Sequence, residues 1–223
     1  DRVELLPGWM AVLYDQWFRP ARTTDEDRAK TAQYRENHAR AELEKTLSYD
    51  EFLQSLDIRL TRVDPAGDAA RDRLFQMLQK TNQFNLTTHR YTRQELDALL
   101  TKGWPVYLYR AADRFGRYGI VAAAIVDTDG PVPVVCDFLM SCRIMGKQIE
   151  NFILDRIETD LAAAGHTRLE ALYRPTAKNA PVAHLYESLG YTPAGTRDDA
   201  RCYTLTLRDK PPRPYHVTEE DPQ

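Results

Sequence analysis

The sequence reads Phe138-Leu-Met-Ser-Cys-Arg-Ile-Met-Gly-Lys-Gln148 where an apolar strand passes, without a long loop, into a predicted helix. The first N–H groups of a helix have no intrahelical partner and point outward, so they can hold a phosphate group. Gly146 lets an anion approach closely, and Arg143 and Lys147 add positive charge. The stretch therefore predicts an anion-binding turn. A capping and packing arrangement without a ligand stays open as the alternative.

Alternating strand and helix patterns surround this stretch. Three strand candidates lie at residues 106–111, 118–126 and 132–140, and the turn sequences DRFGR and DTDGP between them favour a consecutive antiparallel meander. The pattern then predicts a helix over 143–164, a strand over 168–173, a helix over 178–189 and strands over 191–195 and 201–207. These elements predict an α/β (α+β) domain, in which helices flank a mixed, mostly antiparallel central sheet.

The chain upstream of the meander is predicted to be mainly helical. A polar helix is expected between residues 23 and 46, and Ser48-x-x-Glu51 is a capping box that begins a second, short helix. Alternation from Ile58 predicts the first strand, and two more helices follow, the second capped by Thr92-x-x-Glu95. We therefore divide the chain into a helical lead-in over 1–56, a main domain over 57–209 and a flexible tail over 210–223, which is rich in Pro and charge.

Length and composition exclude several classes of protein. The 223 residues suffice for one main domain with an appendage, and 30 Lys and Arg against 33 Asp and Glu give a net charge of −3. This balance does not draw the chain to nucleic acid or anionic lipid. No apolar run is long enough to cross a bilayer and no signal peptide is evident, so we expect a cytoplasmic protein without nucleic-acid or membrane partners. Because the sequence begins at Asp1, we interpret it as a piece of a longer protein.

The cysteines and histidines form no metal or disulfide pattern. Cys136, Cys142 and Cys202 make no CxxC pair, and five scattered histidines show no HExxH or HxH spacing. We therefore expect no metal in this chain and a reducing compartment. Cys142 stands apart because it directly precedes Arg143 at the predicted turn, where positive charge favours a reactive thiolate. Cys142 is a candidate nucleophile, and a small buried hydrophobic residue is the alternative.

A second informative stretch runs from Arg174 to Tyr191. It places Asn179 at a helix entrance and Tyr186 about two helical turns further along the same side. The alternative is that Asn179 caps the helix and Tyr186 is a core aromatic residue.

With both stretches in this order around one βαβα unit, the sequence resembles the GNAT-type acyltransferases. Their signature R/Q-x-x-G-x-G/A is similar to Arg143-Ile-Met-Gly146-Lys-Gln148, although Gln148 replaces a small residue. The resemblance implies a GNAT-like acyl-CoA N-acyltransferase fold, here with an N-terminal helical extension. It also implies that a pantetheine arm lies between two splayed strands and that Tyr186 protonates the leaving thiolate. The cofactor-binding residues that it implies are Arg143, Gly146, Lys147, Gln148 and Asn179.

Further strings carry a more specific resemblance: Thr23-Thr-Asp-Glu-Asp-Arg28, Tyr34, Lys80-Thr-Asn-Gln-Phe-Asn-Leu-Thr-Thr-His-Arg-Tyr91, Asp113-Arg-Phe-Gly, Phe138-Leu-Met-Ser-Cys-Arg and Pro175-Thr-Ala-Lys-Asn179. On these strings, within about residues 15–195, the sequence is similar to the C-terminal half of FkbH-like proteins. That family supplies glyceryl- or hydroxymalonyl-type extender units to polyketide assembly lines. The resemblance implies an acyl carrier protein as partner, phosphopantetheine or coenzyme A as cofactor, and a haloacid-dehalogenase-type phosphatase domain in cis or in trans.

The phosphatase chemistry of that family is expected outside this chain. Asp127-Thr-Asp129 imitates the nucleophile motif of such a domain because it follows an apolar run. Pro131 and another strand come directly afterwards, so we interpret the segment as a hairpin turn.

Three residues are candidates for catalysis: Cys142, Tyr186 and His89, the last as a general base because imidazole titrates near neutral pH. The loop between the two middle helices is rich in amides and hydroxyls, which suits recognition of hydroxyl and carbonyl groups. We expect a substrate-binding wall there, made by Asn82, Gln83, Asn85, Thr87 and Thr88. Capping of the adjoining helices by this loop is the alternative.

The leading functional hypothesis is an acyltransferase. It moves a three-carbon glyceryl unit derived from 1,3-bisphosphoglycerate, or a related acyl unit, to the phosphopantetheine thiol of an acyl carrier protein in polyketide-type biosynthesis. The alternatives are a non-catalytic GNAT-like module that docks the carrier protein, and a CoA-dependent N-acetyltransferase. A working Cys142 or Tyr186 separates the first hypothesis from the docking module.

Overall fold

A computed structural model describes residue 10 and residues 25–208, 210 and 212–221. The chain divides into two units, Asp1–Thr46 and Leu47–Gln223. In the first unit the structure describes α2 (Asp25–Glu44), a 20-residue helix where the sequence predicts a polar one. The expectations for residues 1–9 and 11–24 lie outside the described residues.

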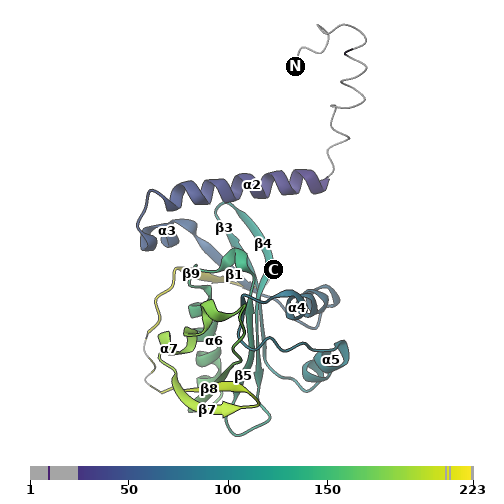
Figure 1. The fold of residues 1–223 in the computed structure, drawn as a ribbon, viewed down its shortest axis with the longest axis vertical. Helices are drawn as coiled ribbons and strands as arrows, with labels where there is room; N and C mark the ends of the chain where they lie inside the picture. Colours follow the sequence, from purple (N-terminus) through teal and green to yellow (C-terminus); the bar gives the residue numbers. More distant parts are fainter. Residues whose placement is uncertain (1–9, 11–24, 209, 211, 222–223) are drawn as a thin grey trace. The chain divides into compact units, whose positions relative to one another are not determined.

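The second unit alternates helices and strands around one sheet. Its helices are α3 (Tyr49–Leu56), α4 (Asp68–Lys80), α5 (Arg93–Thr101), η2 (Cys142–Ile144), α6 (Ile149–Ala163), η3 (Ala180–Val182) and α7 (Leu185–Ser188). Its strands are β1 (Ile58–Arg62), β2 (Phe84–Asn85), β3 (Val106–Asp113), β4 (Gly116–Asp127), β5 (Val134–Met140), β6 (Arg168–Tyr173), β7 (Thr192–Arg197), β8 (Ala200–Thr206) and β9 (Val217–Glu220). Figure 1 shows α4 and α5 on one face of the sheet and α6 and α7 on the other.

The sheet is mixed and mostly antiparallel, as the sequence predicts. Its order is β7-β8-β6-β5-β4-β3-β1-β9, and β2 pairs with β5 away from this path. The predicted meander of β3, β4 and β5 is confirmed, since both of its pairs are antiparallel. Only β5–β6 and β1–β9 are parallel among the described strand pairs. The fold is therefore the predicted α/β sandwich of helices around a central sheet.

Strand β5 is irregular at two places that shape the site. Ile125 pairs with Asp137 and Val126 with Val135, so Cys136 is an extra residue and forms a β-bulge. Between β5 and β6 the register holds only two pairs, Val134 with Glu170 and Val135 with Ala171. Beyond these pairs the two strands separate.

Local sequence signals explain where the early helices begin. Both predicted capping boxes form: the Ser48 and Thr92 side chains accept from the main-chain N–H of Glu51 and Glu95, whose carboxylates bind back to the cap N–H groups. The apolar faces of α4 and α5 then pack on the sheet in one cluster around Leu74, Leu96 and Leu139. The sheet and these helices are held by this core.

The helix expected over 143–164 begins six residues later than predicted. Gly146 and Gln148 have φ angles of 69° and 58°, which an α-helix cannot contain. The helix α6 therefore starts at Ile149, and a short 3-10 turn, η2, precedes it. The helix expected over 178–189 is likewise broken into η3 and α7, because His184 between them has φ −107° and ψ 12°.

Residues 217–220, which the sequence analysis assigns to a flexible tail, are instead part of the sheet. Strand β9 pairs in parallel with β1, from Ile58 with Val217 to Thr61 with Glu220. Before this strand, Arg213 forms an ion pair with Glu158 of α6. Composition alone suggested a solvated tail. The ion pair with Glu158 and the pairing of β9 with the edge of β1 instead hold the described part of this segment on the domain.

In the part of the chain that the structure describes, no helix combines the length and the apolar character that crossing a membrane requires.

Candidate functional site

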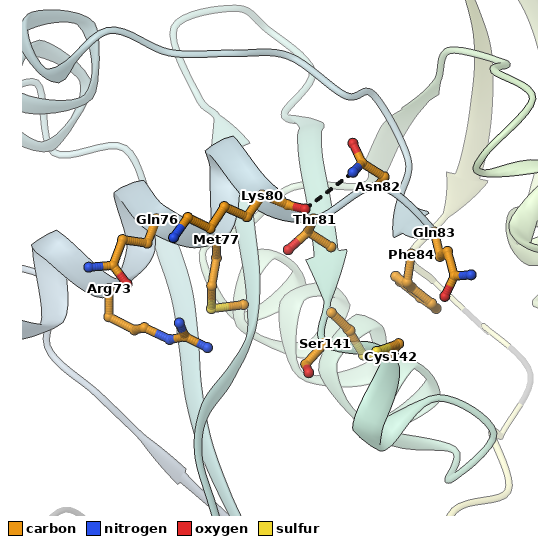
Figure 2. A pocket seen from close by; sticks show the side chains of 11 residues that line it. Arg73, Gln76, Met77, Lys80, Thr81, Asn82, Gln83, Phe84, Ser141 and Cys142 are labelled. Atoms are coloured by element: carbon orange, nitrogen blue, oxygen red, sulfur yellow. Dashed lines mark hydrogen bonds between the residues drawn. The ribbon is translucent and has the colours of Figure 1, made fainter. Parts of the chain in front are cut away.

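A cavity of about 260 Å³ opens beside the end of β5 (Figure 2). Helix α4 forms one side of it, the segment that follows α4 forms the roof, and the start of η2 forms the opposite side. The lining residues are Arg73, Gln76, Met77, Lys80, Thr81, Asn82, Gln83, Phe84, Met140, Ser141 and Cys142. The sequence motif at 138–148 and the loop after α4 thus meet at one place.

The chemistry of the lining favours a short, polar and anionic ligand. Met77, Phe84 and Met140 are buried and provide an apolar base. Amides and hydroxyls surround it, and Arg73 and Lys80 bring positive charge, whereas no lining residue is a carboxylate. Arg73 is positioned by a hydrogen bond of 3.3 Å from its Nε to the Ile120 carbonyl. An ammonium and a guanidinium in one wall attract carboxylate, phosphate or acyl phosphate groups.

Cys142 is the one exposed thiol among the three cysteines, and it lines the cavity. Next to it, the Arg143 Nε donates to Ser141 Oγ over 3.3 Å and the Arg143 Nη2 donates to the Tyr118 carbonyl over 3.1 Å. These bonds hold the guanidinium at the Ser141 hydroxyl and the Tyr118 carbonyl, one residue along the chain from Cys142. Burial raises the pKa of the Cys136 thiol, which donates to the Ile125 carbonyl and is not a comparable nucleophile.

The predicted anion-binding turn has open space but no side-chain cap. A Cβ added to Gly146 would meet nothing within 4 Å, and Gln148, at the cap position of α6, makes no capping hydrogen bond. Gln148 Oε1 is buried without a partner among the described residues. Helix α3 borders the turn: Tyr49 donates to the Gly146 carbonyl over 3.0 Å, and the Lys147 ammonium lies 5.5 Å from the Phe52 ring centre. Phosphate oxygens would fit at the turn itself.

The space between the separated strands β5 and β6 is filled by the chain itself. Strand β2 pairs with the end of β5, Phe84 with Met140 and Asn85 with Leu139. The next residue bridges the gap: Leu86 N–H donates to the Phe138 carbonyl over 2.9 Å, and its carbonyl accepts from Arg174 N–H over 2.7 Å. In this structure the segment therefore occupies the place between β5 and β6 where the resemblance implies a pantetheine arm.

Buried polar contacts keep β2 in this position. Asn179 is fully buried; its Nδ2 donates to the Asn85 and Arg174 carbonyls, and its Oδ1 accepts from Tyr173 OH and Thr176 N–H. The side chain of Asn85, also buried, accepts from the N–H groups of Thr87 and Thr88. At roughly 1 kcal/mol for each hydrogen bond and about 2 kcal/mol for each buried Phe or Leu side chain, removing β2 costs several kcal/mol.

A second polar cluster lies at the bulge of β5. The Asp137 carboxylate accepts from the hydroxyls of Thr87 and Tyr91, and the exposed His89 ring stands edge-on to Tyr91 at 4.2 Å. Burial raises the pKa of Asp137 to about 6, although the two hydroxyls and the positive charges of His89 and Arg174 act in the opposite direction. Asp137 is the one charged residue in an otherwise apolar strand end, and sequence reasoning overlooked that signal.

Tyr186 is buried and is not one of the residues that line the cavity. Its ring packs against Tyr191 and Tyr203, and burial raises the pKa of its hydroxyl well above the usual value. Within the described part of the chain, this hydroxyl has no hydrogen-bond partner.

The structure brings some of the predicted site residues together and separates others. Cys142, Asn82 and Gln83 line one cavity, while Thr87 and His89 belong to the Asp137 cluster. Strand β2 is held by contacts of Asn85, Thr88 and Asn179. The predicted anion-binding turn before α6 contains Arg143, Gly146, Lys147 and Gln148. Sequence reasoning missed Arg73, Gln76 and Lys80, whose spacing of three and four residues places them on one face of α4 and was an available signal. No group of three potential metal ligands occurs among the described residues.

Comparison with known proteins supports the fold. No protein-family model and no curated protein matches the sequence. Among solved structures, a chain of the NatC complex bound to Gag peptide and CoA is similar with a TM-score of 0.53, 11% identity and coverage of 68% of this chain and 99% of that one. A domain from Methanocaldococcus jannaschii is similar with a TM-score of 0.52 and 14% identity, over 68% of this chain and 99% of that one. With its open, mostly antiparallel sheet between helices, the chain has the fold of the GNAT acetyltransferases.

Proposed function

We propose that the protein is an acyltransferase in which Cys142 carries the acyl group as a thioester. The observation that supports this most strongly is the position of an exposed thiol at a cavity whose wall holds two cations, several amides and no carboxylate. The GNAT fold is compatible with acyl transfer, but fold alone does not assign chemistry. The proposal therefore depends on the cavity.

Two balanced exchanges make up the reaction. First, the Cys142 thiolate attacks the carbonyl carbon of an acyl phosphate; the carbon–sulfur bond forms as the bond to the phosphate oxygen breaks, and phosphate leaves. Second, the thiolate of a carrier-bound phosphopantetheine attacks the thioester. The acyl group moves to the carrier and the Cys142 thiolate is released. No electron donor or acceptor is needed in either step.

The acyl group best suited to the cavity is a three-carbon glyceryl unit from 1,3-bisphosphoglycerate. Arg73 and Lys80 can neutralise its phosphate groups, and Asn82, Gln83 and Ser141 can bind its hydroxyl and carbonyl oxygens. The volume of about 260 Å³ suits a short chain rather than a fatty acyl chain. The resemblance of the string Lys80 to Tyr91 to FkbH-like proteins supports the same choice.

The partners follow from this chemistry. An acyl carrier protein supplies the accepting thiol, and a haloacid-dehalogenase-type phosphatase domain, in cis or in trans, removes the remaining phosphate. A reducing compartment such as the cytoplasm keeps the Cys142 thiol free.

The test is to incubate the chain with 1,3-bisphosphoglycerate and holo carrier protein, with and without a separately supplied phosphatase domain, and to record intact masses. We expect a phosphoglyceryl increment on the chain that Cys142→Ala abolishes, and transfer to the carrier that falls more than about 10³-fold in that variant. Cys202→Ala, at a buried position that does not line the cavity, serves as the matched control. Carrier binding without any mass increment would favour the docking module, and acetylation of an amine by acetyl-CoA would favour the N-acetyltransferase.

A further inference from the structure

Where β5 and β6 separate, the main-chain groups on their facing edges need partners other than each other. Two parallel strands that part leave N–H and C=O groups unpaired along both inner edges. On this chain the pairing ends after Val135 and Ala171, while β5 continues to Met140 and β6 to Tyr173. A ligand with amides in an extended chain could pair with both edges, and pantetheine has two such amides.

Segment Phe84–Leu86 already makes these pairings from within the chain. It is antiparallel to β5 on one side and accepts from Arg174 N–H on the other, so it lies as an additional strand in the opening. Phe84 and Leu86 are 3% and 0% exposed, and the Phe84 ring packs edge-to-face on Phe138 with centres 5.3 Å apart. The opening is thus filled by side chains as well as by main chain.

The segment is also tied down at its centre. The Asn179 Nδ2 donates to the Asn85 carbonyl over 2.8 Å, and the Asn85 Nδ2 donates to the Thr81 carbonyl over 3.2 Å. Both asparagines are fully buried, and all four polar atoms of their side chains have partners. An unpaired amide in such a place is costly, so these contacts favour one position of the segment.

We propose that segment Phe84–Leu86 is a built-in occupant of the β5–β6 opening and closes it to coenzyme A and to pantetheine. Asn179 is the positioning residue that keeps the segment in place. A thiol partner must then reach Cys142 from the open side of the cavity, between α4 and η2; this last part rests on the proposed function. The two residues that precede the segment, Asn82 and Gln83, line that cavity.

The experiment titrates coenzyme A into the full chain by calorimetry and follows amide hydrogen exchange at Leu86 and Arg174. We expect no saturable binding of coenzyme A at concentrations up to about 1 mM. We also expect slow amide hydrogen exchange at both residues, at a rate that coenzyme A leaves unchanged. Saturable binding with faster exchange at both amides would show that the ligand displaces the segment, and would overturn the proposal. Binding with unchanged exchange would place coenzyme A elsewhere and leave the opening closed.

A pair of variants tests the role of Asn179. Asn179→Asp keeps the side-chain oxygen that accepts from Tyr173 OH and Thr176 N–H, but it replaces the amide NH₂ group that donates to the Asn85 carbonyl. Amide hydrogen exchange at Leu86 should therefore accelerate at least about tenfold. Lys178→Ala, at an exposed neighbouring position, should leave it unchanged. Circular dichroism confirms that each variant is folded, and unchanged exchange in a folded Asn179→Asp protein would refute the positioning role. Thioester formation at Cys142 is measured in a separate experiment. A failure of the proposed acyl transfer is therefore distinguishable from a failure of the proposed closure of the β5–β6 opening.

Discussion

The Asn179 side chain donates to the main-chain carbonyl of Asn85 over 2.8 Å, across 94 residues of sequence. This single contact joins the loop after β6 to the segment that forms the roof of the Cys142 cavity. Since the same amide also donates to the Arg174 carbonyl, it fixes both sides of the β5–β6 opening. The geometry of the candidate site therefore depends on a residue that does not line it.

Replacement of Asn179 by Ala should lower the free energy of unfolding by about 3 kcal/mol, because several buried donors and acceptors lose their partner at once. Urea unfolding followed by circular dichroism measures this difference. The exposed Lys178→Ala substitution should change the value by less than about 0.5 kcal/mol. A change of that small size in Asn179→Ala would mean that the loop is held by other contacts.

The sheet and most helices could be predicted because their signals are local. The capping boxes at Ser48 and Thr92, and the alternation in β3 to β5, are confirmed in the structure. The long-range pairings could not be predicted in this way. Strand β2 is only two residues long, and β9 follows a Pro-rich segment, so neither carries a pattern of its own. Both are defined by the unpaired edge that each one meets.

The candidate site was predictable where residues lie close in sequence. Cys142 and the turn at Gly146 share one motif, and Asn82 and Gln83 share another, but nothing in a single sequence indicates that α4 faces Cys142. The separation of Tyr186 from the cavity also depends on packing, since its ring is placed by Tyr191 and Tyr203.

The three cysteines should differ sharply in reactivity. Cys142 is exposed, whereas burial raises the pKa of both Cys136 and Cys202. Iodoacetamide at neutral pH should therefore add a single adduct to the folded chain, and peptide mapping should place it on Cys142. In Cys142→Ser the adduct should be absent. Equal labelling of Cys136 under native conditions would contradict the closed packing of the β5 bulge.

Asp137 should make the stability depend on pH between about 4 and 6. Its folded pKa of about 6 lies above the 3.8 of an unperturbed aspartate, chiefly because of burial. In this interval the folded chain binds more protons than the unfolded one, so stability falls as pH rises and levels off above pH 6. The loss amounts to about 3 kcal/mol at 1.36 kcal/mol per pKa unit.

The Asp137→Asn variant isolates this effect. The amide keeps the shape of the carboxyl group and can still pair with the hydroxyls of Thr87 and Tyr91, but it does not titrate. Urea midpoints from pH 4 to pH 8 should fall for the wild type relative to Asp137→Asn, whereas the exposed Asp199→Asn should follow the wild type. Parallel curves for wild type and Asp137→Asn would show that folding does not raise the pKa of Asp137.

Gln148 should be a site of stored backbone strain. Its φ of 58° is left-handed, a conformation that costs a residue with a side chain roughly 1 kcal/mol and glycine almost nothing. Gln148→Gly should therefore be more stable than Gln148→Ala by about 1 kcal/mol in urea unfolding. Both variants remove the buried, unpartnered Oε1, so their difference reports the backbone alone. Equal stability would mean that residue 148 is not left-handed in solution.

The C-terminal strand should depend on the buried ion pair of Arg213 with Glu158. The Arg213 and Glu158 side chains are 2% and 0% exposed, and the carboxylate also accepts from Tyr191 OH over 2.8 Å and from the Lys210 ammonium over 3.2 Å. Arg213→Ala leaves that charge buried with fewer partners, and should cost about 3 kcal/mol of unfolding free energy.

A double-mutant cycle separates this pairing from general loss of packing. If the charge is what matters, Glu158→Ala combined with Arg213→Ala should be less destabilised than the sum of the single changes, with a coupling of about 2 kcal/mol. Arg208→Ala, at an exposed position on the same segment, should be neutral. Amide exchange at Val217 and Glu219, which pair with β1, should accelerate in Arg213→Ala and not in Arg208→Ala. Additive single effects with slow exchange in β9 would show that the strand is held by its pairing with β1 rather than by the ion pair on α6.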